Sequence, residues 1–337
     1  RVDPEQLQMD ELQKKHIAVV PAYVKVAHAS RNLLPSCTHG ILMSLIEAVR
    51  GGDASFFTYT CYDEELCFTF PEKDIKLFEL PGVTITSASW VPLFLCEGAL
   101  GFDSSGIVER MTKPLAQASI PVFYLSTYLT DYVLVEKNHL QQAFDCLSNL
   151  YIIDVESSEV LQSIAPDVNA QLLLPSVVQE KIPGSPHLSK AVKLSASPLC
   201  SDPNVPIMVT PKSKPVYLCS LPFHVLQSNF LLLMELIFKK LDSHFFTVSM
   251  TPDEASFIVD EEMMSELTLL PDISFYNEKW FLISFSVGEN STEECGIIWN
   301  LSRPFQDISI FHVSAVRHNH ILVKEGDRDR CKRVLET

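Results

Sequence analysis

An internal repeat constrains the fold of this chain more than any other feature of its sequence. Residues 55–68, SFFTYTCYDEELCF, resemble residues 244–257, HFFTVSMTPDEASF. Residues 120–126, IPVFYLS, resemble residues 308–314, ISIFHVS. The offset between matching positions stays between 188 and 190 residues along the chain. The simplest explanation is two homologous halves of about 150 residues each, with a separate segment between them.

Each half is expected to contain two similar units with the element order βαββαβ, the split βαβ or ferredoxin-like arrangement. Apolar runs and alternating patterns predict the strands, and apolar residues at helical spacing predict the helices. In the first half we expect strands at 23–28, 56–61, 66–70, 90–96, 122–127, 132–135 and 151–155, with helices at 37–49, from 106 onward and at 138–150. In the second half we expect strands at 216–221, 245–250, 256–260, 280–287, 308–315 and 320–324, with helices at 223–241 and 296–306.

The expected fold class is therefore α+β, with four ferredoxin-like units arranged as two homologous tandem pairs. The expected boundaries are 18–89 and 90–157 in the first half, and 215–278 and 279–337 in the second. The segment 158–214 contains eight prolines, so we expect it to be an irregular linker.

Charge and hydropathy argue against several classes of partner. The 26 Lys and Arg residues are outnumbered by 42 Asp and Glu residues, and the net charge is −16. No basic cluster is visible, so we expect neither a nucleic-acid partner nor an anionic membrane surface. The longest apolar run, residues 230–238, contains a Glu and is far shorter than the roughly 20 residues that a membrane span needs. No secretory signal is recognisable, and we expect a cytoplasmic protein without membrane insertion.

Sequence motifs for catalysis or metal binding are not found. The nine cysteines form no CxxC pair and no group with zinc spacing, which predicts reduced core thiols. There is no Walker A motif, no GxGxxG and no GxSxG nucleophile elbow. His312, His318 and His320 form a small cluster, in which we expect the segment around Asn319 to be a solvated β-turn rather than a metal site. We therefore expect no enzyme, no metal and no cofactor.

The stretch that most suggests binding is GFDSSGIV at residues 101–108, an expected turn between a strand and a helix. Gly101 lets the backbone approach a ligand closely, and Gly106 opens the helix. Free amides at the helix start, together with the hydroxyls of Ser104 and Ser105, suit a ligand carboxylate. A polar residue of this turn could equally serve only as the helix N-cap, so both interpretations stay open at this point.

The Gly-Ile-Val start of this helix and the strands that follow it resemble ACT domains, which are small-molecule-binding regulatory modules. Residues 101–108, residues 125–135 (LSTYLTDYVLV) and residues 245–262 (FFTVSMTPDEASFIVDEE) resemble the CASTOR family, the cytosolic arginine sensors of the TOR pathway. The resemblance covers both halves but not the segment between them. It implies four ACT domains, a homodimer formed through the first and third units, and arginine bound between the second and fourth. It also implies inhibition of a GATOR-type complex that arginine relieves.

The resemblance implies one ligand site per chain, assembled from both halves. The implied ligand-binding residues are Gly101, Phe102, Asp103, Ser104, Ser105, Gly106, Ile107, Thr127, Tyr128, Asp131, Ser309 and Ile310. The second half has Asn319 in the place of Asp131, and the first half has Pro121 in the place of Ser309. Compared with the vertebrate sensors, the ligand-binding residues that each half contributes are therefore exchanged between the two halves.

Alternatives remain open for the identity of the ligand and for the function of the protein. Asp103 or Asp131 could form paired charge-assisted hydrogen bonds with a guanidinium, which makes arginine the first expectation. The vertebrate sensors carry Asp-Glu-Cys where this chain has Asp-Ser-Ser at 103–105, so lysine or a neutral amino acid remains open. Two other functions also remain open: a ligand-independent ACT scaffold or inhibitor with a decayed pocket, and a regulatory subunit of an amino-acid biosynthetic enzyme. The acidic segments 62–65 and 260–262 are candidates for partner contact, or are simply solvated loops.

Overall fold

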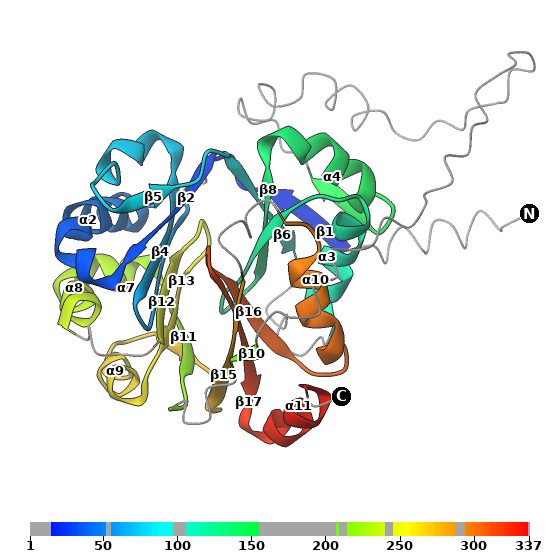
Figure 1. Cartoon of the computed structure of the whole chain (residues 1–337). Helices are drawn as coiled ribbons and strands as arrows, with labels where there is room; N and C mark the ends of the chain where they lie inside the picture. Colours follow the sequence, from blue (N-terminus) through cyan, green and yellow to red (C-terminus); the bar gives the residue numbers. More distant parts are fainter. Residues whose placement is uncertain are drawn as a thin grey trace, which may run out of the picture.

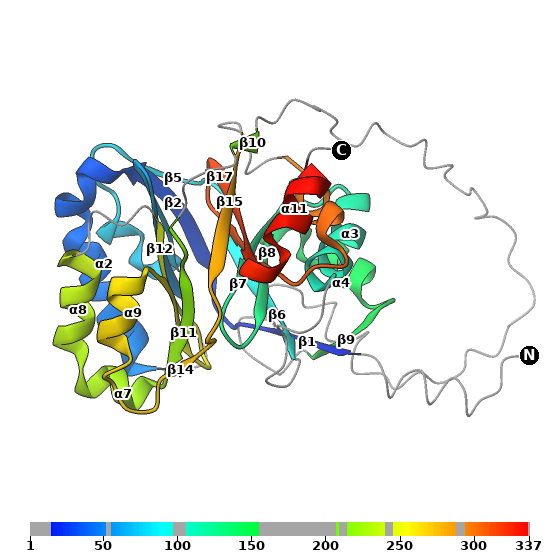
Figure 2. The same cartoon turned by 90° about the horizontal axis from the view of Figure 1, so that it is seen from below.

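Two mainly antiparallel sheets lie face to face, and helices cover both outer surfaces in the computed structural model of the chain (Figure 1). The structure describes residues 15–51, 55–96, 106–154, 207–208, 214–239, 245–287 and 294–335. Seen from below, the order of layers is helices, sheet, sheet, helices (Figure 2). One sheet belongs to the first and third units, and the other to the second and fourth.

The first sheet has the strand order β5-β2-β4-β3-β12-β13-β11-β14. The first unit contributes β2 (Val24–Ser30), α2 (Leu34–Arg50), β3 (Phe57–Tyr62), β4 (Glu65–Pro71), a 3-10 segment (Glu72–Leu77) and β5 (Val83–Ile85). The third unit contributes β11 (Tyr217–Leu221), α7 (Phe223–Ser228), α8 (Phe230–Lys239), β12 (Phe245–Met250), β13 (Ala255–Val259), α9 (Glu261–Leu267) and β14 (Ser274–Phe275). The six-residue pairing of β3 with β12 joins the two units edge to edge.

The second sheet has the strand order β9-β1-β6-β8-β7-β16-β17-β15-β10. The second unit contributes β6 (Trp90–Cys96), α3 (Ile107–Gln117), β7 (Val122–Ser126), β8 (Asp131–Glu136), α4 (Leu140–Leu147) and β9 (Tyr151–Asp154). The fourth contributes β15 (Trp280–Ser286), α10 (Ile297–Ser302), β16 (Ile310–Ser314), β17 (His318–Lys324) and α11 (Arg328–Leu335). Two further strands, β1 (Lys15–Val19) and β10 (Ile207–Met208), also pair in this sheet.

A pseudo-twofold axis relates the two halves, and the sequence repeat fixes where it passes. Tyr59 pairs with Val248, which lies 189 residues later and is its own repeat counterpart. Leu125 pairs with Val313, its counterpart 188 residues later. A residue can pair with its own counterpart only on the symmetry axis, so the axis crosses both sheets at the contacts between units.

The space between the sheets is filled by one apolar cluster drawn from all four units. Strand alternation places Phe123 and Leu125 in this cluster, whereas Tyr124 points to the helix side. Single bridges at Val24–Trp90 and at Val216–Trp280 connect the two sheets, so the strands close into a flattened barrel. Separate clusters lie under the helices on each outer face.

The α+β fold of ACT-like units expected from the sequence is confirmed, with local differences. The helix expected at 223–241 is divided at Asn229, whose side-chain amide donates to the carbonyl of Val225. Strand β1 partly falls in the range expected for the first unit but pairs with β6 and β9 of the second. Strand β10 falls in the expected linker, whose other described residue is Lys214, and pairs with β15.

The described cysteines are free thiols, and five of them, Cys37, Cys61, Cys67, Cys219 and Cys331, are buried. Within the described ranges, no helix combines the length and the apolar character required to cross a bilayer.

Candidate functional site

The start of α3 lies at the contact between the second and fourth units, where α3 packs against α10 (Figure 1). Gly101, Phe102, Asp103, Ser104 and Ser105 lie outside the described residues. Gly106 occupies the N-cap position with φ of +76°, and Ile107 is the first, buried residue of the helix. The helix therefore begins where the repeat pattern predicted.

Both halves place a left-handed glycine at this contact. A Cβ atom on Gly106 would lie 3.2 Å from the carbonyl oxygen of Gln306 in the fourth unit. Its counterpart Gly296 has φ of +79°, and a Cβ there would lie 3.6 Å from the Cβ of Ala116 in the second unit. Each half thus brings its helix start against the other half.

Gly106→Ala is expected to lower the free energy of unfolding by about 1–2 kcal/mol, because an L side chain is strained at positive φ. Gly326→Ala is the matched control, because nothing lies within 4 Å of a Cβ there. Urea unfolding of both variants tests this expectation. Equal losses in the two variants would contradict it.

Asp131 is the first residue of β8, and its side chain lies on the helix-covered face of the second sheet. Its Oδ1 accepts a hydrogen bond of 2.6 Å from the Ser126 hydroxyl. Burial raises the pKa of this carboxyl to about 6, and hydrogen bonds from Ser126 and Tyr124 partly oppose the rise. Asp131 is therefore a carboxylate held in an environment that disfavours its charge.

Two serines link the second and fourth units across the axis. The Ser126 hydroxyl accepts from the backbone amide of His312 at 3.0 Å, and the Ser314 hydroxyl accepts from the amide of Tyr124 at 3.1 Å. Ser314 in turn donates to Oδ1 of Asn319 at 2.8 Å, as Ser126 donates to Asp131. The two halves thus build the same network, with an aspartate in one and an asparagine in the other.

The expectation of a solvated turn around Asn319 is wrong. Residues His318, Asn319 and His320 lie in β17, and His320 and Asn319 are buried. His312 Nε2 lies 3.0 Å from Asn319 Oδ1, and Ser284 Oγ lies 3.0 Å from His320 Nδ1. Burial lowers the pKa of His312 to about 4, and burial also holds the pKa of His320 well below its usual range. Within the described residues, no group of three or more potential ligand side chains could hold a metal ion.

Thr127 and Tyr128 lie in the turn between β7 and β8, and this turn contacts the third unit. The backbone amide of Tyr128 donates to the Ser256 hydroxyl at 2.8 Å, and that of Leu129 donates to Glu254 Oε1 at 2.8 Å. Thr127 is buried and its hydroxyl donates to the carbonyl of Thr130 at 2.7 Å. The turn is therefore fixed between the two sheets.

Ser309 and Ile310 lie at the start of the strand that pairs with β7. Ile310 begins β16 and packs against the apolar cluster that contains Ile107. Both residues are partly buried. The structure therefore places Gly106, Ile107, Asp131 and Ile310 on the helix side of the contact between the second and fourth units, whereas the 127–130 turn reaches the third unit.

Sequence reasoning missed Ser126, Ser314 and Glu254. The serines are aligned by the quoted repeat at an offset of 188, and their retention in both halves was the available signal. The repeat likewise aligns Glu254 with Glu65, a charged residue kept in both hairpins.

The acidic segment 260–262 forms the start of helix α9, a role that was not identified from the sequence. Asp260 is the N-cap of α9, and its Oδ1 accepts from the amide of Met263 at 2.9 Å. Glu261 and Glu262 lie in the first turn, where negative charge is favourable.

Comparisons with known proteins show what the chain is similar to. The ACT domain family model matches residues 87–149, which span the second unit. The chain is 23% identical over 321 residues to the Mus musculus protein named cytosolic arginine sensor for mTORC1 subunit 1, covering 90% of this chain and 91% of that protein. It is 30% identical over 134 residues to the Homo sapiens protein CASTOR3P, covering 37% of this chain and 81% of that protein. It is similar to an aspartate kinase structure from Synechocystis with 10% identity and a TM-score of 0.35, over 96% of this chain and 55% of that chain.

Proposed function

The chain belongs to the CASTOR family of tandem ACT-domain proteins, and we propose that it is a cytoplasmic amino-acid sensor of the TOR pathway. The proposed ligand is one basic amino acid, arginine first, bound between the second and fourth units. The proposed output is ligand-dependent contact with a GATOR-type complex, made by a homodimer. This proposal rests on the names of the relatives and on the site around Asp131.

The observation that carries the proposal is the partly buried carboxyl of Asp131, whose charged form the surrounding protein disfavours. Its pKa is raised to about 6, although the corresponding position of the other half holds the neutral Asn319 in the same hydrogen-bond network. An asparagine would accept the hydrogen bond from the Ser126 hydroxyl without the free-energy cost of a desolvated charge. A carboxylate retained at such a position is a candidate for a functional group, and a guanidinium is the partner that would favour its charged form.

Binding at this contact would couple occupancy to shape. A ligand that touches both α3 and β16 adds contacts that exist only when the second and fourth units are docked. It therefore shifts the population toward the docked arrangement, by no more than its difference in affinity for the two arrangements. A partner that recognises one of these arrangements would respond to the amino acid without any catalysis.

Isothermal titration calorimetry of the full chain with arginine tests the site. Asp131→Asn is expected to weaken arginine binding by about 30-fold or more, because it removes the charge that faces the guanidinium. Asp145→Asn, which changes an exposed aspartate of α4, is the matched control and should leave the affinity unchanged. Arginine binding that is insensitive to Asp131→Asn would refute the site.

A pull-down of GATOR-type subunits with and without saturating arginine tests the output. Release of the partner on adding arginine supports the sensor function. Partner binding that ignores arginine, together with no heat in the titration, would replace the sensor by a ligand-independent scaffold.

A further inference from the structure

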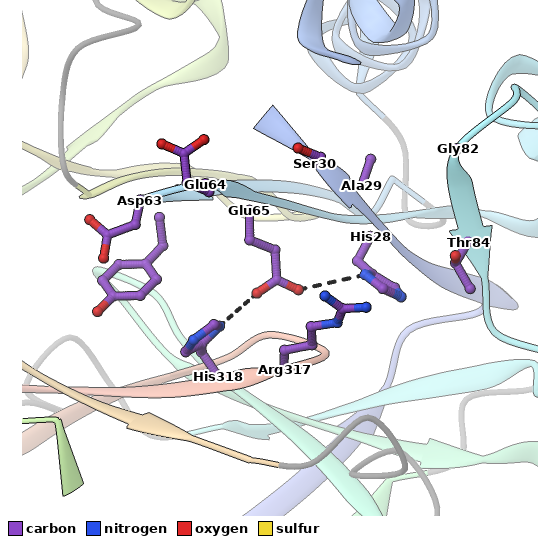
Figure 3. A pocket seen from close by; sticks show the side chains of 11 residues that line it. His28, Ala29, Ser30, Asp63, Glu64, Glu65, Gly82, Thr84, Arg317 and His318 are labelled. Carbon is purple, nitrogen blue, oxygen red and sulfur yellow. Dashed lines mark hydrogen bonds and ion pairs between the residues drawn. The ribbon is translucent and has the colours of Figure 1, made fainter. Parts of the chain in front are cut away.

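A cavity opens where the first unit meets the fourth (Figure 3). Its volume is about 550 Å³, within the range of pockets that hold small molecules. The walls come from β2, from the β3–β4 hairpin, from β5 and from the turn before β17. Nothing in the arrangement around Asp131 involves this cavity, which lies between units of opposite sheets.

The Glu65 carboxylate lies between two imidazoles in this cavity (Figure 3). Glu65 Oε2 lies 2.6 Å from His318 Nδ1, but Glu65 Oε1 lies 3.7 Å from His28 Nδ1, which is too long for a hydrogen bond. The side chain of Glu65 is 12% exposed, and its Oε1 is enclosed and accepts no hydrogen bond from the described residues. A buried acceptor without a donor is costly, so a ligand N–H aimed at this oxygen would be favoured.

The pseudo-symmetric position shows how the protein closes such a space. Glu254, the counterpart of Glu65, accepts the amide of Leu129 at 2.8 Å. The rings of Tyr128 and Tyr276 lie beside each other there, with centroids 4.7 Å apart. Each glutamate thus has one oxygen with a hydrogen-bond partner and one without, but tyrosine rings lie beside Glu254, whereas a cavity stays open over Glu65.

The charges around the cavity select the class of ligand. Three carboxylates, those of Asp63, Glu64 and Glu65, line it together with one guanidinium, that of Arg317. The carboxylates outnumber the guanidinium, so the lining attracts cations. Its acidic wall is held in place: the Arg31 guanidinium donates to the carbonyl of Asp63 at 2.9 Å, and Asp63 itself takes a φ of +44°.

We propose that this cavity between the first and fourth units is a second ligand site, which binds a small organic cation through an ammonium or guanidinium group on Glu65. The proposed ligand needs no carboxylate, because its cationic group alone pairs with Glu65. It is therefore independent of the amino-acid site proposed between the second and fourth units. Because its walls come from both halves, an occupant would bridge the two sheets.

Agmatine is the probe, because it carries both an amine and a guanidinium but no carboxylate. Calorimetry of the full chain should show binding that Glu65→Gln weakens at least tenfold. Thr84→Trp should abolish it, because Thr84 is exposed on β5 and lines the cavity, so that an indole there fills the space. Glu79→Gln, at an exposed glutamate of the same unit, is the matched control and should bind agmatine unchanged.

Asp131→Asn separates the two sites and should leave agmatine binding intact. Loss of agmatine binding in Asp131→Asn would overturn the proposal, because the cation would then occupy the other site. No binding to the unmodified chain at millimolar agmatine would overturn it as well. So would binding that survives both Glu65→Gln and Thr84→Trp in variants whose melting temperatures show that they remain folded.

Discussion

Trp90→Ala is expected to lower the free energy of unfolding by about 3–5 kcal/mol, the cost typical of removing a large aromatic side chain from a core. Trp90 is 1% exposed and lies where the two sheets are bridged, paired with Val24. Its ring packs edge-on against Phe123 with centroids 4.9 Å apart. A cavity at this corner would weaken the contact between sheets as well as the core itself. Denaturant unfolding followed by circular dichroism measures the loss.

Trp90→Phe distinguishes packing from hydrogen bonding. The Trp90 indole Nε1 has no hydrogen-bond partner among the described residues, so a phenylalanine loses only volume. We expect its cost to stay below about 2 kcal/mol. Leu269→Ala, at a side chain that is 84% exposed, should change the stability by less than about 0.5 kcal/mol. A loss under 1 kcal/mol for Trp90→Ala would show that this corner is not part of the cooperative core.

The fold was largely predictable because the repeat and the apolar patterns agree. Each quoted repeat segment became the same element in both halves, and β3 and β12 even pair with each other. What the sequence did not reveal is long-range pairing. Strand β1 is short and amphipathic, and only its partners β6 and β9 show that it belongs to the second unit's sheet. The order of layers likewise follows from packing across the chain, which no local pattern encodes.

The sequence predicted which residues belong to the candidate site, but it did not predict their burial or their hydrogen-bond partners. The resemblance led to Asp131, yet it did not reveal the hydrogen bond from Ser126, whose hydroxyl also accepts the amide of His312 in the fourth unit. The prediction of a turn at residues 318–320 was wrong because polar residues usually favour turns, whereas here His320 pairs with Ser284 and Asn319 pairs with His312 inside a strand. The sequence showed Glu65 as part of an acidic segment, but it did not show that this side chain lines a cavity.

The stability of the protein should carry a signature of Asp131 between pH 4 and pH 6. The carboxyl has a pKa of about 6 in the folded chain against an ordinary value of 3.8. Between these values the folded protein holds a proton that the unfolded chain has lost, so the contribution of Asp131 to stability falls as the pH rises. Above pH 6 the cost is constant and on the order of 3 kcal/mol.

Asp131→Asn should remove this cost, because Asn319 shows that an asparagine fits the same network. At pH 7.5 the variant is therefore expected to be more stable than the unmodified chain by up to about 3 kcal/mol, and the difference should vanish below pH 4. Urea unfolding of both proteins across this range measures the difference directly, because all other titrating groups are common to them. A variant less stable than the unmodified chain at pH 7.5 would contradict the raised pKa. A guanidinium ligand acts in the opposite sense: it favours the ionised carboxylate, so arginine affinity should fall as the pH drops below about 6.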